Sequence, residues 1–383
     1  MGQLSIWSFP TRVVFGVGAV AETGNEVKRL GASRALIVTD RGVVKAGLVA
    51  PVEQALASAG VAMTVFDGVE PNPVEKNVHD GVDAYREAKA DIIVAIGGGS
   101  PLDVGKIIRL KARPGVHERP LVDYDDATGG DAFITANVPP MLALPTTAGT
   151  GSEVGRSGVV TLDANRRKTV IFSPHFMANA AILDPELSIS MPARTTAATG
   201  FDALTHCLEA YVSLGDHPMA DSIALGGLRL VAEHLERAVS KPNDLAARGG
   251  MMKAAMMGAV AFQKGLGACH SLAHPLSNLC GLHHGLANAL CLAAVVEFNA
   301  EIAGPRLAAA AQALGADPSP RGLATRLREL QRGIGLPGSL SAAGVKADQL
   351  EALADGAIAD ACHRCNPRPC NRADLLGLYQ ASF

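Results

Sequence analysis

Apolar strand-like segments alternate with segments of helical periodicity in the first half of the chain, and this pattern constrains the fold more than any other feature. The strand-like segments are RALIVTD at 34–40, MTVFDGV at 63–69, DIIVAIGGG at 91–99 and MLALPTT at 141–147. The stretches with helical spacing are 47–60, 74–90 and 100–112. Such alternation predicts a parallel sheet covered by helices.

The pattern changes at residues 184–192, where strand signals give way to helical stretches rich in Ala, Leu and Met. Within 220–240, Leu228, Val231 and Leu235 form an apolar stripe at helical spacing, which we assign to the core. A chain of 383 residues is long enough for two domains. We therefore predict an α/β domain over residues 1–187 and an all-helical (all-α) domain over residues 188–383.

Composition excludes several classes of partner. The 34 basic and 37 acidic residues give a net charge of −3 and no basic stripe, so neither nucleic acid nor an anionic membrane is expected as a partner. The most apolar stretches, 251–262 and 286–296, are shorter than the roughly 20 residues of a membrane span. The N-terminus lacks the pattern of a signal peptide. With neither a membrane span nor a signal peptide indicated, we expect a cytoplasmic protein. An odd number of scattered cysteines, seven, favours reduced thiols over a disulfide framework.

Histidines and one aspartate form the strongest functional pattern in the second half. Asp202 and His206 are four residues apart, as are His270 and His274, so each pair leaves one face of a helix. Imidazole nitrogen and carboxylate oxygen are ligands for Zn²⁺ or Fe²⁺, and one such pair cannot close a site by itself. His284 supplies a third segment. Any one of these histidines could be an ordinary polar side chain on a partly buried helix, but the set predicts a divalent-metal site.

A glycine-rich turn marks the first half. Gly97, Gly98, Gly99 and Ser100 follow a strand and open a helix, so backbone N–H groups can approach a pyrophosphate at the positive helix end. Pro101 fits the first helical turn. The turn is not the Gly-x-Gly-x-x-Gly fingerprint. A tight turn without a ligand is the alternative interpretation.

Two further segments suggest nucleotide contacts. Asp40 closes the first strand-like segment, where a carboxylate can bind the adenosine ribose and repel a 2′-phosphate, which favours NAD over NADP. Asp40 could also simply cap a turn. Thr146, Thr147 and Thr150 in PTTAGTGSE could donate to phosphate or to the nicotinamide amide, although the loop could be a plain connector.

Five motifs, in order and covering essentially the whole chain, resemble the iron-containing (group III) alcohol dehydrogenase family. They are IGGGSPLDVGK, LPTTAGTGSE, GFDALTHCLEAYVS, GLGACHSLAHPLS and HHGLANA. The resemblance implies an N-terminal Rossmann-like α/β domain and a C-terminal helical metal-binding domain. It also implies that the cofactor and the metal lie in the cleft between them.

The resemblance also assigns roles to the histidines. The implied metal ligands are Asp202, His206, His270 and His284. His274 is implied to lie close to the nicotinamide and the metal without being a ligand, and we expect it to position groups and relay a proton. His283 directly precedes His284, but the following Gly285 and the spacing of fourteen from His270 favour His284.

On the cofactor side, the resemblance implies that five residues wrap the pyrophosphate: Gly98, Gly99, Ser100, Pro101 and Leu102. It assigns Asp40 and Asn72 to the adenosine end, and Thr146, Thr147, Thr150 and Lys168 to further contacts. Lys168 lies among charged neighbours in NRRKTV and could be a solvated surface residue. Asn72, in EPNP, could be only a turn residue.

The implied activity is an NAD-dependent, metal-dependent interconversion of a primary alcohol and its aldehyde by hydride transfer. Fe²⁺ is the expected metal and Zn²⁺ the alternative. A reductase of a more functionalised aldehyde or keto acid is the alternative activity. A metal-dependent hydrolase would explain the histidines but not the glycine-rich half. The family also suggests a homodimer or larger homo-oligomer, with residues 4–16 a candidate for subunit pairing.

Three cysteines near the C-terminus allow a second interpretation. Cys362, Cys365 and Cys370 lie in ACHRCNPRPC, and Cys-x-x-Cys is a ligand pair of structural zinc sites. A second pair is missing, however. The family often has an Asn-Pro-Arg turn near its C-terminus, which corresponds here to residues 366–368.

Overall fold

Contacts within the computed structural model, which describes the backbone of residues 5–7 and all of residues 11–383, divide the chain into two compact units. The first unit runs to Thr147 and resumes over Ser152–Ser190, and the second comprises Ala148–Gly151 and Met191–Phe383. The main division falls after Ser190, whereas the sequence placed the boundary after residue 187. The inclusion of Ala148–Gly151 in the second unit was not predicted.

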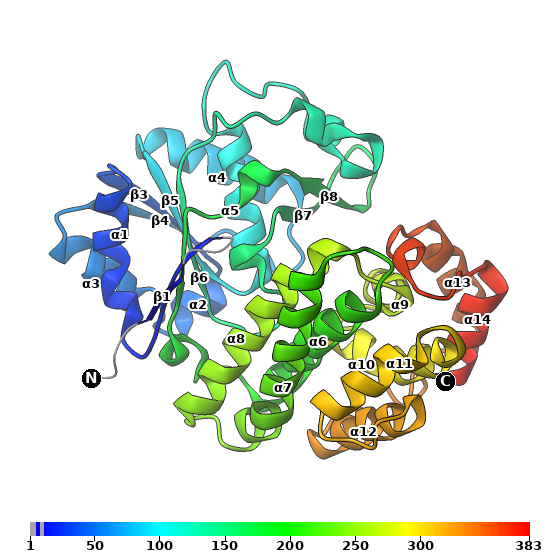
Figure 1. Ribbon diagram of the computed structural model, residues 1–383. Coiled ribbons are helices and arrows are strands. Elements are labelled where there is room, and N and C mark those ends of the chain that lie inside the picture. Colours follow the sequence, from blue (N-terminus) through cyan, green and yellow to red (C-terminus); the bar gives the residue numbers. More distant parts are fainter. Residues whose placement is uncertain (1–4, 8–10) are drawn as a thin grey trace. The chain divides into compact units, whose positions relative to one another are not determined.

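The first unit contains a seven-stranded sheet among the described residues, with the order β1-β2-β9-β6-β5-β3-β4 (Figure 1). β1 pairs antiparallel with β2, and every other neighbouring pair is parallel. The strands are β1 (Ser5–Trp7), β2 (Arg12–Phe15), β3 (Arg34–Val38), β4 (Ala62–Phe66), β5 (Ile92–Gly97), β6 (Met141–Pro145) and β9 (Ala180–Leu183). This parallel α/β architecture confirms the predicted fold class of the first half.

The strand order reverses between β3 and β5. β3 has β4 on one side and β5 on the other, while β5 is followed by β6 on its far side. Ligands of open parallel sheets bind outside the carboxyl ends of the strands at such a switch point. Asp40 follows β3 and Gly97 ends β5, so both predicted cofactor residues lie at this end of the sheet.

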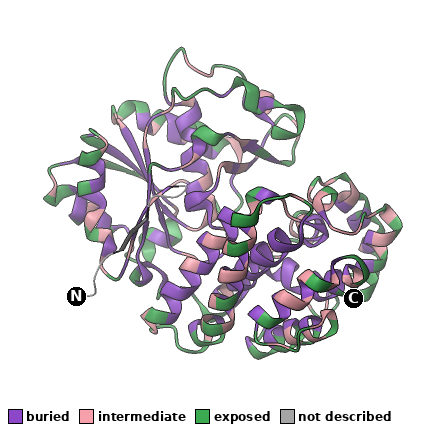
Figure 2. Ribbon diagram, viewed as in Figure 1, coloured by how far each residue is buried: buried purple, intermediate pink, exposed green. Residues whose placement is uncertain are grey.

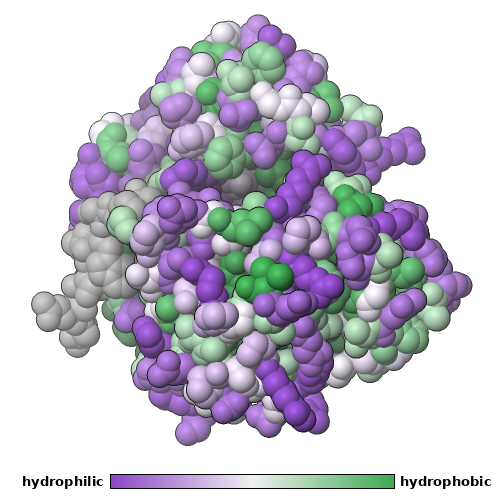
Figure 3. Space-filling view, turned by 45° about the vertical axis from the view of Figure 1, so that its right-hand side comes forward, coloured by the Kyte–Doolittle hydropathy of each residue, from purple (hydrophilic) through white to green (hydrophobic). Residues whose placement is uncertain are grey.

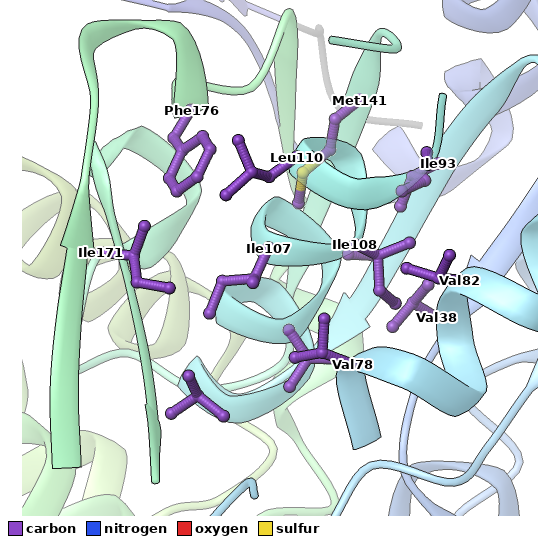
Figure 4. Packing of buried hydrophobic residues seen from close by; sticks show 14 of the residues in the cluster. Val38, Val78, Val82, Ile93, Ile107, Ile108, Leu110, Met141, Ile171 and Phe176 are labelled. Atoms are coloured by element: carbon purple, nitrogen blue, oxygen red, sulfur yellow. The ribbon is translucent and has the colours of Figure 1, made fainter. Parts of the chain in front are cut away.

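Helices cover both faces of the sheet, and the central strands are buried on both sides (Figure 2). Along β5, Ile93 belongs to a core cluster with α4 (Glu75–Glu87) and α5 (Gly99–Lys111). Its neighbours Ile92 and Val94 belong to a cluster on the opposite face with α1 (Thr23–Arg29) and α3 (Ala50–Ser58). Alternation of side chains along a strand produces this division. Figure 4 shows Ile107 and Ile108 of α5 among the apolar side chains of the first cluster.

The elements predicted for the first half are confirmed, with small shifts at their ends. The predicted strands are β3, β4, β5 and β6, and the predicted helices are α3 (Ala50–Ser58), α4 and α5. The sequence did not predict β9 or the antiparallel hairpin of β7 (Ser157–Thr161) and β8 (Lys168–Phe172). Of the proposed pairing segment 4–16, β1 and β2 pair with each other, and residues 4 and 8–10 lie outside the described residues.

The second unit is entirely helical among its described residues. Its α-helices are α6 (Ala193–Val212), α7 (Pro218–Ser240), α8 (Leu245–Ala261), α9 (Ala268–Cys280), α10 (His284–Phe298), α11 (Ala300–Ala313), α12 (Pro320–Gly333), α13 (Leu350–Ala359) and α14 (Arg372–Ala381). α6 is buried over most of its length and packs against α7, α8 and α10. Leu228, Val231 and Leu235 of α7 are fully buried, which confirms their predicted place in the core.

The segment Ala148–Gly151 lies against two of these helices. A Cβ at Gly149 would be 2.8 Å from Cβ of Thr199 on α6, and a Cβ at Gly151 would be 2.3 Å from Cβ of Ala259 on α8. Gly151 also has φ +61°, which glycine adopts without strain. The glycines of this loop are therefore required for close packing against α6 and α8.

The surface offers no extended apolar area on the face drawn in Figure 3, where hydrophobic residues form small groups among hydrophilic ones. No single helix in the described chain is both long and apolar enough to cross a membrane. Among the described residues, one pair of consecutive helices, α10 and α11, is together long and apolar enough, but it is bent by 118°.

Truncating the core of the first unit is expected to cost stability. Ile108→Ala removes a fully buried side chain between α5 and α4 and should lower the free energy of unfolding by about 2–5 kcal/mol. Val44→Ala, at a position 41% exposed, is the control and should change it by less than about 0.5 kcal/mol. Urea unfolding followed by circular dichroism measures both, and equal shifts would contradict the assigned core.

Candidate functional site

Asp202, His206 and His270 form a buried polar group in the helical unit. Asp202 and His206 lie one turn apart on α6, with His206 Nε2 3.9 Å from Asp202 Oδ1. His270 comes from α9, and its ring stacks on that of His206 with 4.8 Å between centroids. One ligand atom from each of the three residues lies within 4.8 Å of the others. These spacings suit a single metal ion.

His284, the first residue of α10, adjoins this group. Its Nε2 lies 3.5 Å from Asp202 Oδ1, and its side chain is 31% exposed. Gly285 permits the approach, because a Cβ there would lie 2.0 Å from the Ala198 carbonyl oxygen on α6. Asn288, one turn further on, donates from Nδ2 to Asp202 Oδ1 over 2.8 Å. Thus the structure brings all four proposed ligands together.

Two other histidines border the group. His283 caps α10, because its Nδ1 accepts the N–H of Gly285. His274 stacks on His284 with 5.2 Å between ring centroids and 14° between planes. Its Nδ1 lies 2.8 Å from Asp360 Oδ2, and it shares a second possible ligand group with Asp360 and Cys362.

Protonation states in the group favour cation binding. Burial, followed by the neighbouring His206, His284 and His274, lowers the pKa of His270 well below its usual value. Burial also lowers the pKa of His284 to about 4, although Asp202 opposes the shift. Burial raises the pKa of Asp202, but His206 and His284 outweigh it and the net pKa is lowered. Neutral imidazole and ionised carboxylate are the forms that bind metal.

Two buried ring nitrogens of this group have no hydrogen-bond partner among the described residues. They are Nδ1 of His206 and Nε2 of His270. Buried polar atoms are nearly always paired, so unpaired ones need an explanation. A divalent cation would satisfy His270 Nε2, and the residues present therefore fit a metal ion.

Glu209 and Asp360 contact these histidines but were missed in the sequence. Glu209 Oε2 lies 2.6 Å from His270 Nδ1. Burial raises the pKa of Glu209 to about 8, while N–H groups including that of Cys269 oppose the rise. Glu209 is seven residues after Asp202, which places it on the same face of α6 and could have identified it. No comparable signal exists for Asp360.

At the switch point of the first unit, the glycine-rich turn meets two other loops. Gly97 has φ +150°, and a Cβ there would lie 2.6 Å from Cγ of Pro101. Its carbonyl oxygen accepts the N–H of Thr146 after β6. The hydroxyl of Ser100 donates to the Pro71 carbonyl over 2.8 Å, which ties the turn to the loop after β4.

The remaining predicted cofactor residues have varied surroundings. Asp40 caps α2 (Arg41–Lys45), since its Oδ1 accepts the Val43 N–H over 2.9 Å. Asn72 is exposed in the loop after β4, and Lys168 is exposed at the start of β8, paired with Thr161. The other positions are Gly98 and Gly99, half-buried; Leu102, buried in α5; Thr147, half-buried; and Thr150, half-buried in the segment that belongs to the helical unit.

Two family models match nearly the whole chain. The model described as iron-containing alcohol dehydrogenase matches residues 10–185, and that described as Fe-containing alcohol dehydrogenase family, C-terminal, matches residues 196–383. The chain belongs to the iron-containing alcohol dehydrogenase family. It is therefore an oxidoreductase of the alcohol dehydrogenase and aldehyde reductase class, and the family implies a metal and an NAD(P) cofactor.

Relatives within the iron-containing alcohol dehydrogenases carry different substrate names. The 4-hydroxybutyrate dehydrogenase of Cupriavidus necator is 40% identical over 97% of this chain and 98% of its own length. The NAD-dependent methanol dehydrogenase of Bacillus methanolicus is 36% identical over 96% of each chain. A crystal structure of 1,3-propanediol oxidoreductase matches with a TM-score of 0.92 and 36% identity over 100% of both chains.

A buried network of charged and polar side chains holds α5, the helix that begins at the glycine-rich turn. Lys106 on α5 donates to Ser152 Oγ over 2.6 Å and to the Ser157 carbonyl, and Ser152 donates to Asp103 over 2.6 Å. Glu153 lies beside them with 3% exposure, and burial raises its pKa to about 7 despite opposition from its backbone bond and Lys106. This network connects α5 to the segment after residue 151.

Glu153 should make stability depend on pH. Its pKa is raised in the folded state from 4.5 to about 7, so its contribution is fully present below pH 4.5 and is lost as pH rises through 7. Relative to Glu153→Gln, the wild type should lose up to about 3 kcal/mol of unfolding free energy between pH 5 and pH 8. Urea unfolding at both pH values measures the difference, and parallel pH dependence of the two proteins would refute it.

Proposed function

We propose that this chain is an NAD-dependent, metal-dependent dehydrogenase that interconverts a primary alcohol and its aldehyde by hydride transfer. The observation that carries the proposal is the buried group of Asp202, His206 and His270 beside His284, with an unpaired imidazole nitrogen directed to no protein partner among the described residues. Membership of the iron-containing alcohol dehydrogenases supports the reaction class.

Four residues would hold the metal, for which we propose Fe²⁺, with Zn²⁺ as the alternative: Asp202, His206, His270 and His284. One carboxylate and three neutral imidazoles leave the ion a net positive charge, which would stabilise the negative charge that develops on the substrate oxygen. Asn288 holds Asp202 in place through its amide hydrogen bond. Burial of Asp202 and His270 excludes water from the inner side of the group.

We assign His274 to positioning and proton relay. Its ring stacks on His284 and its Nδ1 is bound by Asp360, so the ring is held next to the ligand group without belonging to it. The His274 side chain is 39% exposed, which gives it a route for proton exchange with solvent. A positioned imidazole with solvent access suits the release of the alcohol proton.

For the cofactor we propose NAD, bound at the switch point of the sheet. Gly97 to Leu102 would hold the pyrophosphate through backbone N–H groups at the start of α5. Asp40 would accept hydrogen bonds from the ribose, and Asn72 would contact the adenosine end. Thr146, Thr147, Thr150 and Lys168 would supply further contacts. The name of the methanol dehydrogenase relative supports NAD.

A second candidate substrate class is a more functionalised aldehyde or keto acid. The relative named 4-hydroxybutyrate dehydrogenase favours it, since 4-hydroxybutyrate carries a carboxylate besides its alcohol. Turnover of a panel of unbranched primary alcohols, diols and ω-hydroxy acids, with NADH absorbance as the signal, distinguishes the two. Absence of turnover with every alcohol and every aldehyde would refute a dehydrogenase.

We further propose a cytoplasmic homodimer or larger homo-oligomer. All seven cysteines are free thiols, as a reducing compartment requires. Cell fractionation and light scattering on the purified protein test the two statements, and a secreted or monomeric protein would contradict them.

The two histidines of α9 should respond differently to removal. His270→Ala should lose the bound metal and the activity, whereas His274→Ala should keep the metal and lose about 10²-fold or more in kcat. Metal analysis of the purified variants together with steady-state kinetics measures both effects. His79→Ala, exposed in the first unit, is the control and should keep metal and activity. If His274→Ala loses metal as fully as His270→Ala, its assignment is wrong.

Asp40 should determine the choice of dinucleotide. Asp40→Asn removes the negative charge but keeps a side-chain oxygen for the Val43 N–H, and asparagine is a good helix cap. We expect the ratio of kcat/KM for NADP⁺ to that for NAD⁺ to rise roughly tenfold, as for the removal of about 1.4 kcal/mol of repulsion. Unchanged thermal stability checks that the cap is intact. An unchanged ratio would mean that Asp40 only caps α2.

A further inference from the structure

We propose that two carboxylates, Glu209 and Asp360, orient the two histidines of α9 and thereby assign one to metal binding and the other to turnover. The inference rests on the proposed function, in which His270 is a metal ligand and His274 is not. It adds two positioning residues that the motifs did not indicate, and it explains why histidines one turn apart on one helix differ in role.

Glu209 fixes the ring of His270. Glu209 Oε2 lies 2.6 Å from His270 Nδ1, and Glu209 Oε1 accepts the backbone N–H of Cys269 over 2.7 Å. Both side chains are 2% exposed. With Nδ1 engaged, Nε2 is the nitrogen left to join Asp202 and His206. A cation bound at Nε2 favours the ionised form of Glu209 and leaves the ring proton on Nδ1, where the carboxylate accepts it, an arrangement that orients metal-binding histidines.

Asp360, which follows α13, fixes the ring of His274. Its Oδ2 lies 2.8 Å from His274 Nδ1, while Oδ1 accepts the Ser271 hydroxyl and the Cys362 N–H, each over 2.8 Å. Ser271 lies on α9 and also accepts the His363 N–H. The Asp360 carboxylate is therefore held both by α9 and by the segment that follows α13. With Nδ1 held by Asp360, the ring lies parallel to that of His284.

The two pairs differ in what surrounds the ring. His270 is 2% exposed and shares a ligand group with Asp202 and His206. His274 is 39% exposed and shares a group with Asp360 and Cys362 instead. The same Nδ1 pairing therefore produces a buried ligand in one case and a solvent-accessible ring in the other.

The group of His274, Asp360 and Cys362 also contains the ligand types of a second metal site. Both oxygens of Asp360 already accept hydrogen bonds from protein donors, so the described contacts favour positioning over ligation. The number of metal ions bound per chain separates these alternatives.

The first test is Glu209→Gln in the full-length protein. Because both carboxylate oxygens accept N–H groups, the amide nitrogen of glutamine must face a donor, and the ring of His270 loses its support. We expect zinc affinity, measured by competition with a chelator in the absence of cofactor, to fall about 10–100-fold. Glu297→Gln on α10, where the glutamate is exposed and paired with Arg328, is the matched control and should bind zinc as the wild type does.

The second test is Asp360→Asn. We expect unchanged zinc affinity, a kcat lowered about 10–100-fold, and a change of the His274 tautomer, because the amide nitrogen facing Nδ1 turns this atom into an acceptor. Imidazole ¹⁵N shifts of zinc-loaded, histidine-labelled protein report the tautomer. Asp355→Asn, at an exposed aspartate paired with Arg372, is the matched control and should change none of these.

The outcomes separate the two levels of the proposal. If Glu209→Gln binds zinc normally while His270→Ala does not, the positioning role fails and the metal ligands stand; if His270→Ala also binds normally, the proposed function fails. If Asp360→Asn loses zinc as Glu209→Gln does, Asp360 is not a separate positioning residue. If Cys362→Ser, which keeps the backbone N–H to Asp360, reduces the bound metal from two ions to one, the group is a metal site and the role of Asp360 is overturned.

Discussion

The close approach of α10 to α6 at Gly285 is the constraint on which the arrangement of ligands depends. With any larger residue there, a Cβ atom would lie 2.0 Å from the Ala198 carbonyl oxygen, and the start of α10 would have to move away. His284 would then leave Asp202, and Asn288 would no longer support the carboxylate. A single position without a side chain thus allows two helices to place their polar groups around one buried point.

Burial and charge act together at that point. A buried polar group is costly unless it is paired, and here the same burial that makes the group costly keeps the imidazole of His270 neutral. Asn288 donates a hydrogen bond to Asp202, and Glu209 lies within hydrogen-bond distance of His270. One ligand atom each of Asp202, His206 and His270 remains within 4.8 Å of the other two. The free energy stored in unpaired atoms such as His270 Nε2 is recovered when a cation binds, so metal affinity and the stability of the helical unit are linked.

Local pattern explains which parts of the fold and the candidate site the sequence could predict. β3 to β6 are apolar runs that end at Gly, Asp or Thr, and spacing along one helix identified Asp202 with His206. β9 has only four residues, two of them alanine, and carries little strand signal of its own. Asp360 is 86 positions from His274 in the chain, so only tertiary packing brings their side chains together. Glu209, by contrast, follows Asp202 by seven residues on α6, so helical spacing could have indicated this orienting residue but not Asp360.

The segment Ala148–Gly151 has a consequence for the modularity of this protein. The chain leaves the first unit after Thr147, packs Gly149 and Gly151 against α6 and α8, and returns at Ser152. A single cut cannot therefore divide the polypeptide into its two units. A fragment that starts at Met191 would lack the backbone that covers these two helices. A swap of the helical half at one junction would therefore separate α6 and α8 from the four residues that pack on them in this chain.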